Sequence, residues 1–246
     1  MQTLPQSLPF PAKRLLAFLD TLDASPPQEA LTLVLPPGQP LPPPKAVDLE
    51  HREWLEEIAC LTDEKIQDSE TGSIAFWSHN LKAMVLPPFP LETYAVANGL
   101  DTTPLRGLFA KKRTVGVVLL RLGRFSVGVF HDDQLLASKT DTRYVKGRHK
   151  AGGTSQRRFA RIREQQIHLI FLKACHVTQE KLGPYQQELE KIFLGGERHT
   201  LTDFLKACPF LQRQDHLIAK RLLPIDKPRH RELETMPREI WKSQVH

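Results

Sequence analysis

Residues Thr114 to Thr140, TVGVVLLRLGRFSVGVFHDDQLLASKT, decide the fold of this 246-residue chain. They contain three runs rich in apolar and β-branched residues, each long enough to form a strand. The runs are 114–122, 124–131 and 134–140, with the turn residues Gly123 and Asp132-Asp133 between them. This order predicts a three-stranded antiparallel meander. Because the first run is apolar on both faces, we expect it to be a central strand that helices cover.

A long helix is predicted directly after the meander, from about Gln156 to Lys181. Thr154 or Ser155 can cap its start, and Gly183-Pro184 ends it. With the helical period, one side holds Phe159, Ile162, Gln166, Leu169, Ile170 and Val177. The opposite side holds Arg157, Arg161, Glu164 and His168. We therefore expect one side to pack and the other to carry charge.

The residues after this helix predict a strand at 190–194, a helix at 201–207 and a last strand at 217–223. The order of three strands, a helix, a strand and a helix is that of a ribonuclease-H-like α/β domain with a mixed sheet. The charged tail, 224–246, is expected either to be disordered or to dock on RNA.

The first 47 residues contain eleven of the twenty prolines, a density that excludes a long helix or a central strand. We interpret residues 1–47 as a short helix, 13–22, followed by an extended linker. A second helix is predicted within 48–71, from Asp48 to Gln67.

The main domain is expected to span 72–223, which gives an α/β domain with an N-terminal helical and proline-rich extension. It begins with two strands, 74–77 and 83–86, and a short helix at 105–110.

Composition narrows the class of protein. There is no apolar run long enough to span a membrane and no secretory signal, so we expect a cytoplasmic protein. The three cysteines, Cys60, Cys175 and Cys208, are widely spaced and form no Cys-x-x-Cys pair. That spacing favours buried, reduced thiols over disulfide bonds or a zinc site. The ten histidines show no metal-ligand spacing, and we expect no cofactor.

Positive charge is concentrated in one segment. From Arg143 to Arg163 there are eight Lys or Arg and no acidic residue, whereas the whole chain carries only +6. A solvated helix face normally mixes both signs of charge along its length. A local excess of this size instead indicates a surface that contacts a nucleic-acid backbone.

A glycine pair lies inside this basic segment. Gly152-Gly153 permits positive φ angles and close approach of the backbone to a ligand. Gln156 follows in the first turn of the predicted helix, where backbone N–H groups point outward and favour anions.

The run from Gly147 to Arg161, placed after a three-stranded meander, resembles the compact bacterial relatives of the ankyrin-and-zinc-finger (Vms-type) peptidyl-tRNA hydrolases. That family is similar to the middle domain of the eukaryotic and archaeal peptide release factors. The resemblance covers about 72–211. It implies that Gly152 and Gly153 match the glycines, and Gln156 the glutamine, of a Gly-Gly-Gln tip that enters the ribosomal peptidyl transferase centre. Here Thr154-Ser155 is inserted before the glutamine.

The resemblance implies a monomeric peptidyl-tRNA hydrolase whose partners are the large ribosomal subunit and peptidyl-tRNA. The chain shows no ankyrin repeats, zinc finger or stop-codon-reading domain, which favours rescue of stalled nascent chains over ordinary termination. The residues expected to hold RNA phosphates without reading sequence are Arg143, Lys146, Arg148, His149, Lys150, Arg157, Arg158 and Arg161.

The chemistry follows from the residue types. Hydrolysis of an ester at the 3′ end of tRNA needs a positioned water and support for developing oxyanion charge. Because a neutral glutamine is a poor base, Gln156 would act by positioning, through its side-chain carbonyl or its backbone N–H.

Two alternatives remain at this level. The first is a ribosome- or RNA-binding module without hydrolytic activity, which would need the same basic segment. The second is a metal-dependent nuclease, which needs clustered carboxylates. Strand 114–122 has no acidic residue, and Asp132-Asp133 lies in a turn that favours aspartate anyway.

Overall fold

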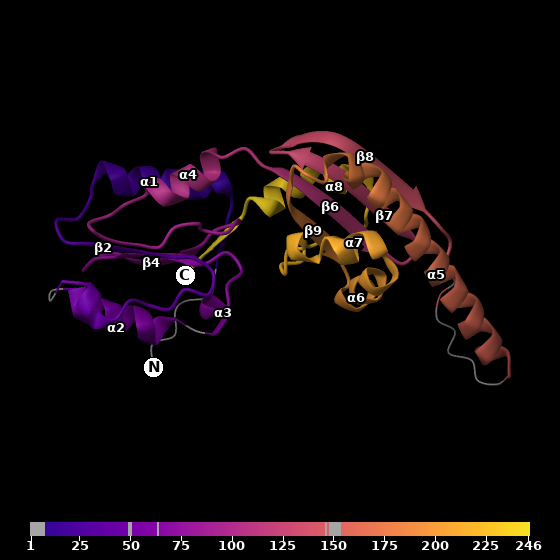
Figure 1. Cartoon of the computed structure of the whole chain (residues 1–246), viewed down its shortest axis with the longest axis horizontal. Helices are drawn as coiled ribbons and strands as arrows, with labels where there is room; N and C mark the ends of the chain where they lie inside the picture. The colour runs from indigo at the N-terminus through magenta and orange to yellow at the C-terminus, as the bar shows by residue number, and fades with distance from the viewer. Residues whose placement is uncertain (1–7, 49–50, 63, 146, 148–153) are drawn as a thin grey trace. The chain divides into compact units, whose positions relative to one another are not determined.

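The computed structural model describes residues 8–48, 51–62, 64–145, 147 and 154–246 (Figure 1). It divides into two compact units. Unit 1 comprises Met1–Lys111 together with Trp241–His246, and unit 2 comprises Lys112–Ile240.

Unit 1 is built on a six-stranded sheet in which every neighbouring pair is antiparallel. The strand order is β1-β10-β4-β3-β2-β5. The strands are β1 (Leu8–Phe10), β2 (Leu31–Leu35), β3 (Ser73–Trp77), β4 (Lys82–Leu86), β5 (Ala95–Asn98) and β10 (Ser243–Val245). Strand β2, which lies between β3 and β5, is buried along its whole length.

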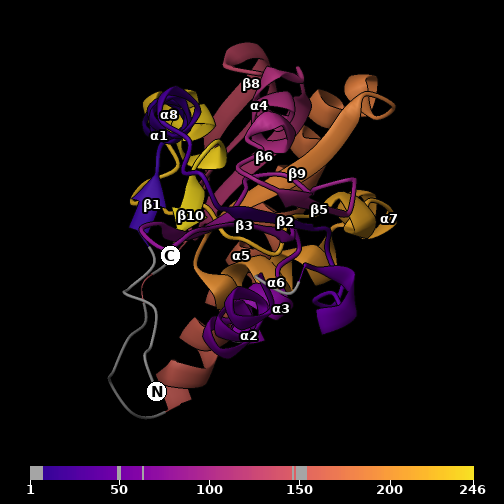
Figure 2. The same cartoon turned by 90° about the vertical axis from the view of Figure 1, so that its left-hand side faces the viewer.

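Helices cover both faces of this sheet (Figures 1 and 2). On one face lie α1 (Ala12–Ala24) and α4 (Thr103–Ala110), and on the other lie α2 (Arg52–Leu61) and α3 (Glu64–Gln67). A short 3-10 helix, η1 (Pro44–Ala46), precedes α2. Trp54, Leu55 and Ile58 of α2 pack against Leu33 and Trp77 of the sheet and form the core on that side.

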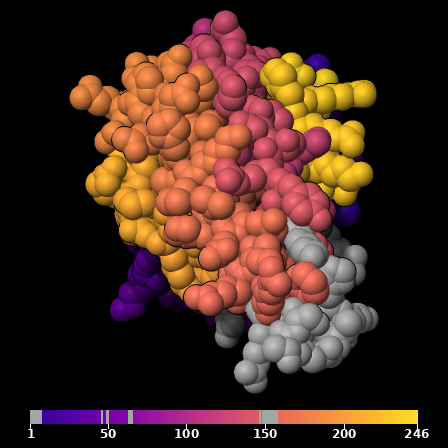
Figure 3. Space-filling model, turned by 90° about the vertical axis from the view of Figure 1, so that its right-hand side faces the viewer, coloured from indigo at the N-terminus to yellow at the C-terminus, as the bar shows by residue number. Residues whose placement is uncertain are grey.

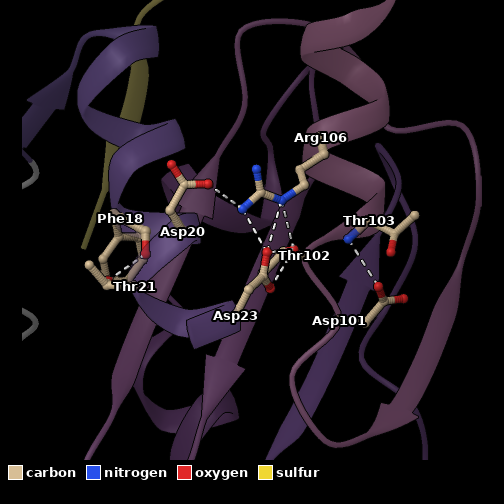
Figure 4. Close-up of polar contacts among 8 residues, drawn as sticks. All are labelled: Phe18, Asp20, Thr21, Asp23, Asp101, Thr102, Thr103 and Arg106. Carbon is tan, nitrogen blue, oxygen red and sulfur yellow. Dashed lines mark hydrogen bonds and ion pairs between the residues drawn. The ribbon is translucent and has the colours of Figure 1, made fainter. Parts of the chain in front are cut away.

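Arg106 links the two helices on the opposite face (Figure 4). From α4 its Nη2 donates to Asp20 Oδ1 at 2.7 Å and to Asp23 Oδ2 at 2.6 Å, both on α1. Thr102 Oγ1 donates to the same Asp23 carboxylate at 2.9 Å. The hydrogen bond from Arg106 to Asp20, followed in size of effect by the one to Asp23, raises the pKa of Arg106 above its ordinary value.

Unit 2 is built on a four-stranded mixed sheet in the order β8-β7-β6-β9. Strands β6 (Thr114–Arg121), β7 (Arg124–His131) and β8 (Gln134–Thr142) form an antiparallel meander. Strand β9 (Leu189–Gly196) then pairs parallel with β6. Only glycine fits at Gly196, because φ is 144° and a Cβ would lie 2.2 Å from the Leu120 carbonyl oxygen.

The helices of unit 2 are α5 (Thr154–Leu182), α6 (Arg198–Ala207), α7 (Pro209–Arg213) and α8 (His230–Ile240), with 3-10 helices η3 (Gly183–Tyr185) and η4 (Asp215–Leu217). The second half of α5 packs with α6 and α7, and the core joins Ile170 and Phe171 to Val127, Leu194 and Phe204. Helix α8 packs against β6, β7 and β8.

The structure confirms the expected class, an α/β protein with a mixed sheet, and the expected order of elements from the meander to α6. The long helix starts two residues before the predicted start and ends one residue after the predicted end. The predicted strands 74–77 and 83–86 and the short helix 105–110 are also present, as β3, β4 and α4.

The N-terminal region differs from the prediction. Residues 31–35, expected in an extended linker within 1–47, form β2 because both edges of this apolar run find partners, in β3 and β5. The helix expected from 48 to 67 is divided into α2 and α3. Of the elements expected in the domain 72–223, β3, β4, β5 and α4 belong to unit 1 and those from β6 onward to unit 2.

The C-terminal region also differs. The tail 224–246 is ordered, with Leu233, Met236 and Ile240 of α8 buried and β10 paired with β1 and β4. Residues 217–223 do not form a full strand and make only two isolated bridges to β9, at Ile218 and Leu223.

The prediction of reduced thiols is wrong for two of the three cysteines. Cys175 on α5 and Cys208 at the start of α7 form a disulfide bond, with their Cα atoms 5.3 Å apart. Packing of α5 on α7 brings the pair together across 33 residues, which spacing in the sequence cannot reveal. Cys60 is free and exposed.

Candidate functional site

The first half of α5 extends beyond the sheet of unit 2 (Figure 1). No side chain from Arg158 to Leu169 is buried, whereas Ile170, Phe171 and Ala174 are. The first turns of the helix, drawn in salmon, lie at the surface of the face seen in Figure 3. Helix α5 therefore has two parts. We call residues 154–169, which extend from unit 2, the α5 arm, and the packed residues 170–182 its root.

The predicted apolar side of this helix is correct only in its second half. Phe159 and Leu169, expected to pack, are 37% and 40% exposed. Ile170 and Val177 are buried as expected. The cause is the reach of the arm, because the part beyond the sheet has little of unit 2 to pack against.

The root of the arm is fixed by contacts of three kinds. Lys173 Nζ lies 2.7 Å from Asp141 Oδ2 on β8, and this ammonium group holds the pKa of Asp141 below its ordinary value. The ring of Phe171 packs on Phe204 of α6, with centroids 5.7 Å apart. The Cys175–Cys208 disulfide adds a covalent link to α7. A rigid root lets the arm hold its N-terminus at a defined distance from the sheet.

The structure places the predicted site residues as follows. Arg158 and Arg161 are exposed on the α5 arm, and Arg143 is exposed directly after β8. Gln156 and Arg157 lie in the first turn of α5, and their side chains are outside the described part of the structure. The other predicted residues, Lys146, Arg148, His149, Lys150, Gly152 and Gly153, lie outside the described residues altogether.

Two further arginines stand beside Arg143. The backbone N–H of Arg143 donates to the Gly123 carbonyl at 3.0 Å, next to Arg124 and close to Arg121. Sequence reasoning missed both residues because they precede the basic segment by about twenty positions. The available signal was an arginine on each side of the Leu122-Gly123 turn.

Asp132 has a structural role at the other end of the sheet. Its backbone has a positive φ of 54°, and its Oδ1 accepts a hydrogen bond from the Arg113 backbone N–H at 2.9 Å. The buried side chain of Arg113 forms an ion pair with the partly exposed Glu190 of β9. Within the described residues, no three His, Cys, Asp or Glu side chains are grouped so that they could hold a metal ion.

None of the helices in the described part of the chain is both long and apolar enough to cross a bilayer.

Residues 113–246 match a family model described as the Actinobacteria/chloroflexi VLRF1 release factor. The match begins one residue after the start of unit 2 and includes α8 and β10.

Among curated proteins, the chain is 32% identical over 117 residues to peptide chain release factor subunit 1 of Archaeoglobus fulgidus. It is 31% identical over 121 residues to the protein of the same name from Methanosphaera stadtmanae. Each match covers 48% of this chain but only 29% of the relative, so the chain matches less than a third of the length of these proteins.

Among solved structures, the archaeal translation termination factor aRF1 aligns with 94% of this chain and 73% of its own, at 15% identity and a TM-score of 0.39. The Vms1 mitochondrial localization core aligns with 70% of this chain and 74% of its own, at 14% identity and a TM-score of 0.45.

Proposed function

Because the chain belongs to the Actinobacteria/chloroflexi VLRF1 release factor family, we propose that it is a peptidyl-tRNA hydrolase that frees nascent chains from stalled ribosomes or large subunits. The observation that carries the proposal is Gln156 in the first turn of a projecting helix, three residues after a glycine pair and inside an acid-free basic segment. The family match confirms the predicted relation to release factors, and the reaction itself is our proposal.

The α5 arm suits a reaction inside a narrow RNA site. A helix rises about 1.5 Å per residue, so the sixteen residues of the arm reach roughly 24 Å from the packed root. An active site buried in ribosomal RNA can be entered by one exposed helix, but not by the broad sheet of unit 2. The reacting residue is therefore expected at the start of the arm.

Gln156 would position the attacking water. Its amide is neutral, with a carbonyl that accepts and an amide group that donates hydrogen bonds. The first four backbone N–H groups of a helix have no partner within the helix, so they can support an oxyanion as it forms. RNA groups around the ester would provide the remaining stabilisation.

The arginines of the arm would seat the phosphates. Arg158 and Arg161 are exposed and three residues apart, which places them on neighbouring turns of one side. Such contacts orient a protein on RNA without reading its sequence. Replacing both with glutamine should weaken ribosome binding and lower the slope of log affinity against log salt by roughly 1.5 to 2.

The proposal is tested by single-turnover peptide release from peptidyl-tRNA on isolated large ribosomal subunits. Gln156→Ala is expected to reduce the release rate by about 100-fold, the loss typical of one oxyanion or positioning group. Binding to the subunit should be unchanged, because no charge is removed. The matched control is Gln165→Ala, which removes an exposed glutamine from the same helix and should release at the wild-type rate.

Binding without release by the wild-type protein, across several peptidyl-tRNAs, would instead support a ribosome-binding module. Full release by Gln156→Ala would refute the positioning role.

A further inference from the structure

The backbones of three arginines lie close together where the β6–β7 hairpin ends. Arg121 and Arg124 are direct cross-strand partners on either side of the turn. Arg124 is also paired with Thr142 of β8, and the next residue, Arg143, donates its backbone N–H to Gly123 of the turn at 3.0 Å. We call Arg121, Arg124, Arg143 and the adjacent Tyr144 the hairpin end.

The pairing of two arginines is costly for the fold. Like charges directly opposite each other on neighbouring strands destabilise a sheet. The acid found beside Arg121 offsets this only weakly, because Asp226 Oδ1 lies 3.8 Å from Nη1 and its side chain is 80% exposed. Asp141, the acid at the end of β8, is already paired with Lys173. A sequence that keeps unfavourable charge at one place commonly does so for a ligand.

Tyr144 adds an aromatic ring at the same place. It is 74% exposed, more than any other exposed large apolar or aromatic side chain in the described part of the chain. The ring is therefore not part of the core of unit 2. An exposed aromatic ring beside arginines is the combination that binds single-stranded nucleic acid, with the ring stacked on a base and the guanidinium groups on phosphates.

The hairpin end also lies where the α5 arm begins to project. Lys173 contacts Asp141 near the end of β8, so the residues of α5 before Lys173 run past this end of the sheet (Figure 1). An RNA held along the arm would continue towards the hairpin end.

We propose that the hairpin end is a second RNA contact, in which Tyr144 stacks on an unpaired base and Arg121, Arg124 and Arg143 bind the neighbouring phosphates. The inference rests on the proposed function in taking RNA as the ligand, but it assigns a contact that is separate from Gln156 and needs no hydrolysis.

The first test measures affinity for a short fluorescein-labelled single-stranded RNA by fluorescence anisotropy, with the full-length chain. Tyr144→Ala is expected to weaken binding by about 5-fold or more, because stacking is lost, whereas Tyr144→Phe keeps the ring and should bind like the wild type. Binding of the same RNA as a duplex should be insensitive to both changes. Wild-type affinity in Tyr144→Ala, or an equal loss in Tyr144→Phe, would overturn the stacking role.

The second test predicts opposite effects of one double variant on RNA affinity and on thermal stability. Arg121→Gln with Arg124→Gln should weaken RNA binding and lower its salt slope by roughly 1.5 to 2, while raising the melting temperature, because the like-charge pair is gone. Asp226→Asn should strengthen RNA binding. The matched control is Arg213→Gln with Arg231→Gln, two exposed arginines on α7 and α8, which should change the affinity less. Equal effects of the two double variants would mean general electrostatics and would overturn the site.

Failure of the proposed function is distinguishable from failure of this inference. Gln156→Ala with full release activity would remove the hydrolytic proposal and leave these binding results standing. Conversely, no detectable binding of single-stranded RNA by the wild type would overturn the hairpin end, whatever the release assay shows, and would direct attention to an acidic protein surface as partner.

Discussion

Loss of the Cys175–Cys208 disulfide bond is expected to lower the melting temperature of unit 2 by roughly 10 °C. The bond closes a loop across 33 residues between α5 and α7. The loop-entropy relation assigns such a cross-link about 3 to 4 kcal/mol of stability. In a unit of this length, Lys112–Ile240, each kcal/mol changes the melting temperature by about 3 °C.

The assay combines calorimetry with a count of thiols. The melting temperature is measured with and without a dithiol reductant, for the wild type and for Cys175→Ala with Cys208→Ala. Thiol titration of the unreduced, denatured wild type should find one reactive thiol, that of Cys60. The control is Cys60→Ser, which removes an exposed thiol and should leave the melting temperature unchanged.

Loss of the same disulfide bond is not expected to change RNA binding. The bond joins the packed half of α5, not the arm, so the double variant should bind RNA as the wild type does at temperatures well below its melting point. Three reactive thiols in the unreduced protein, together with melting temperatures independent of reductant, would refute the reasoning.

Three further changes are predicted. Phe171→Ala should destabilise unit 2 by about 3 to 5 kcal/mol, measured by chemical denaturation, because this buried ring seats the root of the arm; a loss below about 1 kcal/mol would show that α5 is held elsewhere. Arg106→Gln should lower the melting temperature of unit 1 by removing the link to Asp23, and an unchanged value would contradict that role. Asp141→Asn tests pH dependence: Lys173 lowers the pKa of Asp141 from its ordinary 3.8, so the pair stabilises the fold above that pH and the contribution is lost as pH falls through the lowered pKa. The variant should therefore be less stable at neutral pH and lose less stability on acidification, whereas parallel pH curves would contradict the pairing.

The part of the fold that follows from local pattern could be predicted from the sequence. Strands 114–122 and 124–131 are marked by apolar runs and a turn glycine, and the structure has them at nearly the same bounds. The long helix was bounded by its cap residues and by Gly183-Pro184. In each case the signal and the structure concern the same few consecutive residues.

The part that depends on distant pairing could not be predicted. Strand β2 lies among prolines and is stabilised by β3 and β5, whose residues come some forty to sixty positions later. The charged tail conceals β10, which pairs with β1 at the other end of the chain. Sequence patterns do not report such partners, so a short apolar run looks like a linker.

The candidate site shows the same division. The basic segment was visible in the sequence as a local run of charge, and Gln156 lies inside it. Arg121 and Arg124 join Arg143 only through the pairing of β7 with β6 and β8, so their contribution emerged from the sheet register. The exposure of Phe159 and Leu169 was likewise invisible, because helical period says which side is apolar but not how far the sheet reaches.

The central claim is that Gln156, carried at the start of the α5 arm, positions water for attack on the peptidyl-tRNA ester. The most direct measurement is the single-turnover rate of peptide release on isolated large ribosomal subunits, for the wild type, Gln156→Ala and Gln165→Ala at saturating protein. The account predicts release by the wild type and by Gln165→Ala at the same rate, and about 100-fold slower release by Gln156→Ala with unchanged binding. Equal rates for all three proteins would contradict it.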